Sequence, residues 1–379
     1  MEILFWSSLF LIVYPYLVYP VGMALAAVVL RRDVQRAPIE PPTTVLVPAY
    51  NEADSISDTL AHLLRQDYPR ACLQILVISD GSSDETDEIV RGFAHQGVEL
   101  LRQEGRGGKA LALNAGVRRA RGEILIFCDA NARFAPDAVR NLVHNFADPA
   151  VGYVTGQLSL ASPSGSVSGS GSSAYVRYES MVRTAETRVA SIIGVNGGID
   201  AMRATLYSDV SGDLITDFVL PLRVIAGGHR VVYDPRARSI EVANSRLKSE
   251  FRMRVRVALR ALQGLMHMKR LLNPLRHPLT SFCLVSHKLL RYFGFVFLVT
   301  AAVANLWLAF ESQPYLVLLA LHAAIYLIAL LGIGQVGGKV LGRIAVVPAY
   351  LLLSYAAFAA AAFKFVRGQT MATWQPRAG

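Results

Sequence analysis

The sequence is poor in charge and in cysteine. Only 17% of its 379 residues are charged and 53% are hydrophobic, whereas soluble proteins contain about 25% charged residues. Its three cysteines, Cys72, Cys128 and Cys283, are odd in number and far apart, so neither a disulfide framework nor a zinc cluster fits them. These absences predict a membrane protein whose cysteines stay reduced.

Charge is missing altogether from residues 3–30, an apolar run that stops at Arg31 and Arg32. A helix needs about 20 residues to cross a bilayer, so we predict one transmembrane helix in residues 1–32. A cleaved signal peptide is the alternative. Its apolar core usually covers only about 7–15 residues after a basic start, and no basic residue precedes this run.

The C-terminal third contains three more uncharged stretches that are each long enough to cross a membrane. They cover residues 292–310, 312–338 and 344–363. We therefore predict three transmembrane segments in residues 292–363, followed by a tail at residues 364–379. Residues 248–291, which precede them, combine apolar and basic side chains and are predicted to form amphipathic helices in the membrane interface.

Basic residues flank the middle of the chain on both sides. They are Arg31, Arg32 and Arg36 before it, and Lys269, Arg270, Arg276, Lys288 and Arg291 after it. Since positive charge marks the cytoplasmic side, we predict that the middle domain is cytoplasmic and that the protein lies in a bacterial inner (plasma) membrane. The sequence does not decide on which side of the membrane the tail lies. Three crossings after the cytoplasmic domain would place it outside, whereas its basic residues Lys364, Arg367 and Arg377 favour the inside.

The net charge of +10 has two interpretations. A basic chain can bind nucleic acid, but much of this excess lies beside the apolar segments, where it would meet anionic lipid head groups. We therefore predict membrane lipids, and not nucleic acid, as a partner.

Between residues 41 and 247, short apolar strands alternate with helical stretches. This pattern predicts an α/β domain with an open, mostly parallel sheet and helices on both faces. Strands are expected at residues 44–47, 74–78, 99–101 and 124–128. In such sheets, ligands bind beyond the carboxyl ends of the strands, so the residues that directly follow each strand form the candidate site.

Polar motifs follow the first three strands. "PAYNEADSI" at 48–56 opens a helix with acids that suit its positive end. "SDGSSDET" at 79–86 leaves Asp80 at a strand tip, where it would contact a base or ribose, or merely form an Asx turn or N-cap. "GRGGKALALNAG" at 105–116 looks like backbone and the Lys109 ammonium directed at phosphate, although it has neither Walker nor dinucleotide-loop spacing.

The fourth strand leads into "DAN" at residues 129–131. Side chains at i and i+2 of an extended chain point to the same side, so Asp129 and Asn131 can share one divalent hard cation that also holds a diphosphate. A simple turn is the alternative for this tripeptide alone. Its place after the fourth strand, behind three other strand-end motifs, favours the metal.

Four of these motifs, in this order, resemble family 2 glycosyltransferases, which are inverting enzymes with the GT-A fold. They are PAYNE at 48–52, DGSSD at 80–84, GKALALN at 108–114 and DAN at 129–131. The resemblance covers about residues 41–262. A leading span, interface helices and trailing spans are also similar to the layout of bacterial membrane-bound members related to polysaccharide synthases. A GT-A nucleotide-sugar-binding domain is therefore expected at residues 41–247.

The resemblance implies a nucleotide-sugar donor, a UDP- or GDP-sugar. Donor contacts are implied for Ala49, Tyr50, Glu52, Asp80 and Lys109. Asp129 with Asn131 would hold Mg²⁺ or Mn²⁺ on the diphosphate, and the metal would neutralise the charge of the leaving group.

Two later segments resemble the acceptor side of the family. "NGGIDAMR" at 196–203 looks like its acceptor-side turn, which implies substrate contacts for Asp200 and Arg203. "LITDFVLPLR" at 214–223 looks like its Thr-Glu-Asp motif, with Thr216 in place of the first acid. Asp217 then falls on the general base, which takes the proton of the acceptor hydroxyl; its alternative is an ordinary acid at a helix start.

A basic stretch, "FRMRVRVALRALQGL" at 251–265, resembles the Gln-x-x-Arg-Trp segment of processive family members. Only Arg256 is kept there, and it would pair with the diphosphate. Met253 and Val257 replace the glutamine and the tryptophan, which puts chain polymerisation in doubt. An interfacial helix with a basic face is the alternative.

We therefore predict an inverting membrane glycosyltransferase that moves a sugar from a nucleotide-diphosphate sugar to a membrane-associated saccharide or lipid-linked acceptor, in polysaccharide biosynthesis. Two alternatives stay open. One is the transfer of a single sugar to polyprenyl phosphate. The other is a catalytically silent nucleotide-sugar-binding scaffold, which Thr216 and the altered segment around Arg256 would allow.

Overall fold

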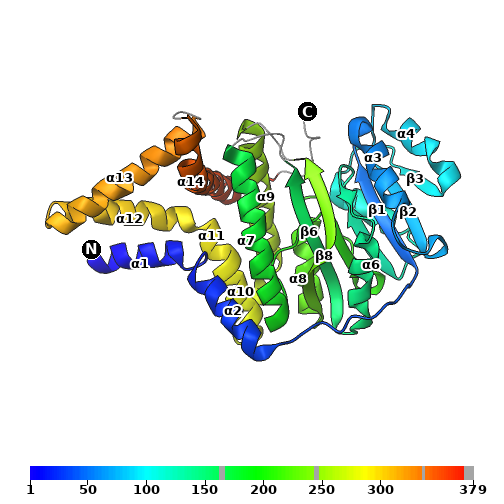
Figure 1. The fold of residues 1–379 in the computed structure, drawn as a ribbon, viewed down its shortest axis with the longest axis horizontal. Helices are drawn as coiled ribbons and strands as arrows, with labels where there is room; N and C mark the ends of the chain where they lie inside the picture. Colours follow the sequence, from blue (N-terminus) through cyan, green and yellow to red (C-terminus); the bar gives the residue numbers. More distant parts are fainter. Residues whose placement is uncertain (162–166, 243–246, 335–337, 371–379) are drawn as a thin grey trace.

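The computed structural model describes residues 1–161, 167–242, 247–334 and 338–370. A single mixed β-sheet lies in the middle of the chain (Figure 1). The strands are β1 (Thr43–Ala49), β2 (Leu73–Ser79), β3 (Val98–Arg102), β4 (Ile124–Cys128), β5 (Arg133–Phe134), β6 (Val151–Ala161), β7 (Ile199–Arg203) and β8 (Arg230–Val242). Their order across the sheet is β3-β2-β1-β4-β7-β6-β8-β5.

The first half of the sheet is parallel, as the sequence predicts. β1 lies between β2 and β4, with Val45 opposite Ile75 on one side and Ile126 on the other, and β3 pairs with the outer edge of β2. β4 covers the expected residues, and the other three strands run at least one residue longer. The carboxyl ends of β1, β2 and β4 therefore meet at one edge.

The second half reverses direction. β7 runs antiparallel to β4, so that Ile199 lies opposite Cys128, and β6 is antiparallel to β7. β8 is parallel to β6 and pairs with the short β5 in antiparallel fashion. Because β7 begins beside the end of β4, the loop before Ile199 reaches the same edge as the residues after Cys128. The expected α/β class, a GT-A-like and mostly parallel sheet, is confirmed.

Both faces of the sheet are buried under helices, which explains the unbroken apolar runs of its strands. The helices around it are α3 (Ala53–Leu64), α4 (Thr86–Gly92), α5 (Lys109–Val117), α6 (Ala138–Val143), α7 (Val167–Val189), α8 (Thr216–Ala226) and α9 (Leu247–His267). Short 3₁₀ turns are η1 (Arg70–Cys72), η2 (Ala94–Gln96), η3 (His144–Ala147), η4 (Ala204–Leu206) and η5 (Lys269–Leu272).

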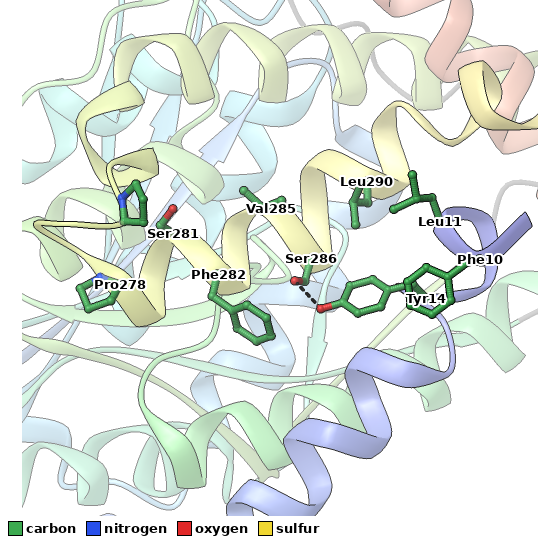
Figure 2. A pocket seen from close by; sticks show the side chains of 10 residues that line it. Phe10, Leu11, Tyr14, Pro278, Ser281, Phe282, Val285, Ser286 and Leu290 are labelled. Carbon is green, nitrogen blue, oxygen red and sulfur yellow. Dashed lines mark hydrogen bonds between the residues drawn. The ribbon is translucent and has the colours of Figure 1, made fainter. Parts of the chain in front are cut away.

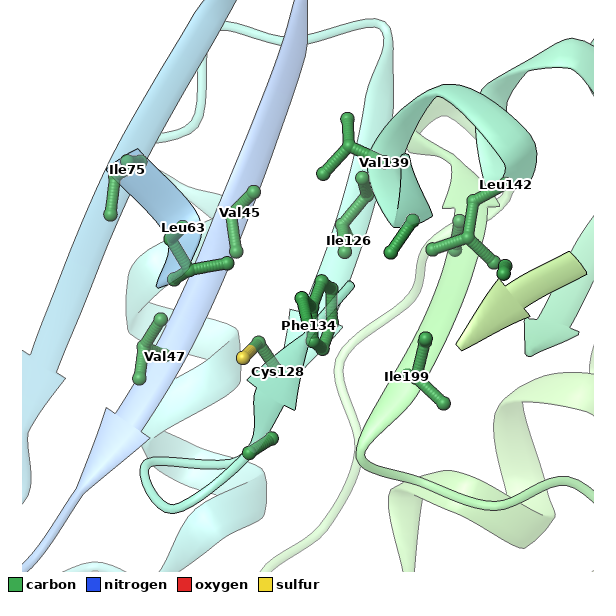
Figure 3. Close-up of a cluster of buried hydrophobic side chains, with 14 of the residues drawn as sticks. Val45, Val47, Leu63, Ile75, Ile126, Cys128, Phe134, Val139, Leu142 and Ile199 are labelled. Carbon is green, nitrogen blue, oxygen red and sulfur yellow. The ribbon is translucent and has the colours of Figure 1, made fainter. Parts of the chain in front are cut away.

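Successive strand residues enter opposite cores, because side chains alternate across a strand. Val45 and Val47 join the cluster under α3, α4 and α6, and Figure 3 shows Val45, Ile126 and Leu142 within it. Leu46 joins the cluster under α5 and α8 instead. Packing in these two clusters holds the strands in place, and with them the residues at the strand ends.

The apolar ends of the chain come together beside this domain. Their helices are α1 (Glu2–Val13), α2 (Val18–Leu30), α10 (Pro278–Cys283), the π-helix η6 (Leu284–Leu289), α11 (Leu290–Tyr292), α12 (Gly294–Ala309), α13 (Gln313–Ile333) and α14 (Gly338–Val366). In Figure 1, α7 and α9 stand between the sheet and these helices. α7 packs against α2, and both α7 and α9 pack against α14.

Two helices among the described residues are long and apolar enough to cross a membrane alone, Gln313–Ile333 and Ile344–Val366. The transmembrane helix predicted within residues 1–32 is bent: α1 and α2 meet at an angle of 52°, at a break that contains Pro15, a residue that interrupts helical hydrogen bonding. The expected span at 292–310 is also part of a bent pair, since α12 meets the segment Pro278–Tyr292 at 59°. Each bent pair has the length and composition of a span only when its halves are joined.

Part of the amphipathic segment predicted at residues 248–291 lies directly before α12, and its place in the membrane interface stays a prediction. Two of its basic residues are buried within the chain: His287 is fully buried and Arg291 is 4% exposed. Both contact carboxylates of α7. An amphipathic pattern does not reveal whether its polar face meets lipid head groups or buried acids of the same chain.

Candidate active site

Asp129 lies at the edge where the parallel strands end. β4 stops at Cys128, and the amide of Ala132 donates to the carbonyl of Asp129 at 3.0 Å. Residues 129–132 therefore form a turn, and the expectation of an extended chain that aligns Asp129 with Asn131 is wrong. The Asp129 side chain is 31% exposed and Asn131 is half-buried, so both remain candidates to meet a ligand.

Lys109 connects the two predicted carboxylates of the site. It opens α5 directly after Gly108, and its Nζ lies 2.7 Å from Asp129 Oδ1 and 3.5 Å from Asp217 Oδ2. It also donates to the carbonyl of Gly197 at 3.3 Å. Burial lowers the pKa of Lys109, but Asp129 and then Asp217 outweigh it and raise that pKa above its usual value. The ammonium is a fixed positive charge between the two acids.

Asp217 lies in the first turn of α8, where the helix dipole favours a negative charge. Its neighbour Thr216 donates a hydrogen bond from Oγ1 to Asp217 Oδ1 at 3.0 Å. The Asp217 side chain is 23% exposed and the Lys109 side chain is 22% exposed. Thr216, which replaces an acid of the resembled motif, thus orients the predicted base.

Asp80 holds the glycine-rich loop. Its Oδ1 accepts from the amide of Gly107 at 2.8 Å and its Oδ2 accepts from the amide of Gly108 at 2.7 Å. The side chain is 3% exposed, so a carboxylate is buried where two amides compensate it. Arg106 of the same loop lies over the ring of Tyr50, 3.9 Å from its centroid. The predicted base or ribose contact of Asp80 stays a prediction, while its contact with this loop is plain.

The motif after β1 is tied to the motif after β2. The carbonyl of Ala49 accepts from the amide of Asp80 at 2.9 Å. The amide of Glu52 donates to the hydroxyl of Thr86 at 2.9 Å, and the Glu52 carboxylate accepts from Ser55 at 2.7 Å. Ala49, Tyr50, Glu52 and Asp80 are therefore brought together at one edge, as predicted.

Asp200 is close to the site but fully buried. Its Oδ2 accepts from the Tyr153 hydroxyl at 2.9 Å and from the Gly197 amide at 3.0 Å, and its Oδ1 accepts from Thr155. Burial, followed by the charge of Asp217, raises the pKa of Asp200 to about 7. Asp200 thus supports the Gly197 loop from inside the domain, and its predicted substrate contact stays a prediction.

Arg203 is separated from the other site residues. It lies at the far end of β7, opposite Ile124 at the start of β4. Its guanidinium donates to the backbone carbonyls of Phe146, Asp148 and Val151 at 2.8 to 3.1 Å. The antiparallel course of β7 thus carries Arg203 away from the edge that holds Asp129, and its predicted substrate contact stays a prediction.

Arg256 is half-buried on α9, and its predicted contact with the diphosphate stays a prediction. One turn further along α9, Arg260 donates to the carbonyls of Gly212 and Leu214. Burial lowers the pKa of Arg260, and the charge of Asp217 acts in the opposite direction. Arg260 therefore holds the loop before α8 near the predicted base, a role that the basic pattern alone did not single out.

Glu241 of β8 is a site residue that the sequence did not reveal, because one acid in a strand carries no motif. A Cβ atom on Gly198 would lie 2.5 Å from Glu241 Oε1 and 3.2 Å from Asp129 Oδ2. The two carboxylates therefore flank the same glycine. Glu241 is 3% exposed.

These residues fit a divalent cation that is shared with a ligand. Among the described residues there is no group of three or more His, Cys, Asp or Glu side chains that could hold a metal on its own. Mg²⁺ usually binds through one or two carboxylates together with substrate phosphates, and Mn²⁺ accepts similar oxygen ligands. Asp129, with Asn131 and Glu241 close by, offers that kind of incomplete set.

Comparisons with known proteins agree with this arrangement. Residues 44–207 match the model of glycosyl transferase family 2. The chain is 30% identical over 224 residues to a poly-beta-1,6-N-acetyl-D-glucosamine synthase from Staphylococcus aureus, covering 57% of this chain and 53% of that protein. A synthase of the same name from Staphylococcus epidermidis is 28% identical over 198 residues, which are 51% of this chain and 48% of that one. The chain thus spans about half the length of these curated relatives.

One solved structure resembles the whole chain. It is a mannosyltransferase from Pyrobaculum calidifontis in complex with GDP-Man and Mn²⁺. The TM-score is 0.72 and the identity 26%, with 97% of this chain and 99% of that chain covered. The likeness therefore includes the apolar helices as well as the sheet.

Proposed function

Since residues 44–207 form a family 2 glycosyltransferase domain, we propose that the protein is an inverting membrane glycosyltransferase. It transfers a sugar from a nucleotide-diphosphate sugar to a membrane-associated saccharide or lipid-linked acceptor, in polysaccharide biosynthesis. The observation that carries this proposal is the meeting of Lys109, Asp129 and Asp217 at the carboxyl edge of the sheet. There, one ammonium and two acids from three separate elements lie together.

The donor lies on the side of Asp80, Tyr50 and Lys109. The glycine-rich loop, which Asp80 anchors through the amides of Gly107 and Gly108, leads into the start of α5, where a phosphate is favoured by the helix dipole. The Arg106 side chain over Tyr50 adds positive charge to this wall. A UDP- or GDP-sugar fits such a surface, and the mannosyltransferase neighbour was solved with GDP-Man.

The transfer is a single displacement. The acceptor hydroxyl oxygen attacks the anomeric carbon on the face opposite the diphosphate, the bond from that carbon to the phosphate oxygen breaks, and the hydroxyl proton passes to the Asp217 carboxylate. A general base of this kind accelerates a reaction roughly 10²–10⁴-fold. Thr216 holds one oxygen of Asp217 at 3.0 Å and so directs the other oxygen toward Lys109 and the acceptor.

Asp129 with Asn131 would hold Mg²⁺ or Mn²⁺ at the diphosphate, and Glu241 lies close enough to assist. A metal bound there would neutralise negative charge on the departing nucleoside diphosphate. Lys109 carries out the same task from the protein side, because its ammonium already faces the carboxylates that would share the cation.

The apolar helices support a place in the membrane. α13 and the Ile344–Val366 part of α14 have the length and composition of spans, and the basic flanks of the sheet domain favour the cytoplasmic face of a bacterial inner membrane. Close packing of α7 on α2 and α14 places the site domain directly against these helices. An acceptor held in the bilayer would therefore be near the site.

The proposal is tested by incubating the purified full chain with labelled UDP- and GDP-sugars and a membrane lipid extract. Label that enters a polymer or an extended lipid-linked saccharide, and that is absent with Asp217→Asn, supports it. Label that appears only as a monosaccharide-lipid would replace it with transfer of a single sugar to polyprenyl phosphate. Absence of transfer from every donor would contradict an enzymatic role.

A further inference from the structure

A buried cluster of charges joins α7 to the π-helix η6. His287 lies between two acids, with Nε2 3.2 Å from Glu179 Oε2 and Nδ1 2.5 Å from Glu186 Oε1. Arg291 pairs with Glu179, and the Tyr19 hydroxyl donates to Glu186 at 2.6 Å. Both carboxylates therefore have close partners, as buried charges require.

Lys288 stands next to this cluster as a surplus cation. In the part of the chain that the structure describes, no carboxylate lies within 4.0 Å of the Lys288 Nζ. The nearby acids pair with other residues: Glu179 with His287, Arg291 and Arg183, and Glu186 with His287. The two acids thus face three basic side chains, those of Arg183, Lys288 and Arg291. A half-buried ammonium that no carboxylate contacts directly is costly, and an anionic ligand would relieve that cost.

The ammonium of Lys288 is directed at the loop that approaches the predicted base. A Cβ atom on Gly194 would lie 2.5 Å from Lys288 Nζ, so the end of the lysine side chain lies against the backbone of Gly194. Gly194 precedes Gly197, which touches the Asp217 carboxylate, by three residues. Three residues of chain reach at most roughly 11 Å. Lys288 and Asp217 therefore lie against residues of the same short loop.

This loop is well held on both sides. Arg183 donates to Asn196 Oδ1, the amide of Asn196 donates to Thr155 Oγ1 at 3.2 Å, and its side-chain amide donates to the carbonyl of Gly156 at 2.6 Å. On the other side, Lys288 belongs to a π-helix, an element that is rare and frequent at functional sites. The surplus cation is thus presented on a rigid frame.

We propose that Lys288 binds a phosphate group of the acceptor, whose hydroxyl reaches Asp217. This inference rests on the proposed function and narrows it: the acceptor carries its nucleophilic hydroxyl and a phosphate at different places. A saccharide linked to a lipid through phosphate has this chemistry, and so does a free sugar phosphate. The break between α1 and α2 lies against η6, the element that contains Lys288, since the Tyr14 hydroxyl lies 3.0 Å from Ser286 Oγ (Figure 2). Because apolar helices adjoin Lys288 there, we favour the lipid-linked form.

The test measures binding of polyprenyl phosphate to the full chain in detergent micelles, without any donor. The neutral polyprenol is the reference ligand, and the variants are Lys288→Met, Lys288→Arg and Lys269→Met. Lys269 is an exposed base on η5 and controls for general attraction of anions. We expect at least tenfold tighter binding of the phosphate than of the alcohol, a loss of that difference in Lys288→Met, and its retention in Lys288→Arg and Lys269→Met.

Equal binding to the native chain and to Lys288→Met would overturn the inference, as would an equal loss in Lys269→Met. Thermal unfolding of each variant shows whether it is folded. If Lys288→Met does not fold, the comparison of the native chain with Lys288→Arg still tests the inference. Competition by inorganic phosphate at millimolar concentration would identify phosphate alone as sufficient, and its failure would identify the lipid-linked form. Release of nucleoside diphosphate by the native chain tests the proposed function separately, so the two can fail independently.

Discussion

Gly197 touches the carboxylate of Asp217. The glycine has a positive φ of +82°, and a Cβ atom there would overlap the carboxylate. The same residue donates its amide to Asp200 and accepts from Lys109 through its carbonyl. Gly197 is thus the point at which the base, the buried acid and the ammonium meet.

Gly197→Ala should reduce sugar transfer by at least tenfold, because the new methyl group displaces Asp217. It should also cost roughly 1–2 kcal/mol of stability from its left-handed backbone. Gly97→Ala is the matched control, since Gly97 has a φ of +85° but a Cβ atom there would meet nothing within 4 Å. Transfer rates and thermal unfolding of both variants separate the two effects. Equal transfer rates in the two variants would refute the role of Gly197.

Lys109→Met should tighten the binding of Mn²⁺ in the absence of donor while lowering the transfer rate. The ammonium 2.7 Å from Asp129 Oδ1 competes with a cation for that carboxylate, so its removal leaves the acid more attractive to a metal. Mn²⁺ titration followed by electron paramagnetic resonance measures this affinity directly. Lys109→Arg keeps the charge and serves as the control. Weaker Mn²⁺ binding in Lys109→Met would contradict the competition.

Asp80→Ala should raise the KM for the donor at least tenfold. The substitution leaves the amides of Gly107 and Gly108 without their acceptors, and the loss of charged acceptors is costly at a buried site. Asp80→Asn retains one oxygen acceptor and should have a smaller effect. Steady-state kinetics against a fixed acceptor measure both. A larger KM in the asparagine variant than in the alanine variant would show that loop anchoring is not the cause.

Asp200→Asn should remove a pH dependence of stability. The pKa of Asp200 is about 7 in the folded protein, against an ordinary 3.8, so between these values the folded state binds a proton that the unfolded state has released. The stabilisation from this proton is complete below pH 3.8 and disappears as the pH rises to about 7. From pH 5 to pH 7.5, the unfolding midpoint should therefore fall further in the native chain than in Asp200→Asn. The exposed Asp209→Asn is the control and should follow the native chain; an Asp200→Asn profile identical to the native one would contradict the shift.

The sequence predicts the parallel half of the sheet well, because β1, β2 and β4 are buried on both faces and therefore stand out as apolar runs. Lys109 and Asp129 could be singled out because one opens a helix and the other follows a strand, whereas Asp217 was singled out by its resemblance to a family motif. Their convergence depends on the strand order, in which β1 pairs with both β2 and β4.

Other features were hidden because local patterns do not encode direction or burial. Arg203 belongs to a motif that resembles an acceptor turn, but the antiparallel course of β7 takes it to the opposite end of β4. Glu241 reaches Gly198 from a strand distant in the sequence. His287 and Arg291 are buried against Glu179, a pairing between distant parts of the chain that no periodicity reveals.

The most direct test of the proposed mechanism is the release of nucleoside diphosphate by the detergent-purified chain. Each sugar of a panel of UDP- and GDP-sugars is assayed in the presence of Mn²⁺, of Mg²⁺ and of EDTA. The native chain is assayed in parallel with Asp217→Asn and with the exposed control Asp209→Asn. The mechanism predicts release from one donor that needs the metal, falls at least roughly 100-fold in Asp217→Asn as expected for loss of a general base, and persists in Asp209→Asn. Release that is equally fast in Asp217→Asn would contradict the assignment of the base, and no release from any donor, even with membrane lipid extract, would contradict the enzyme itself.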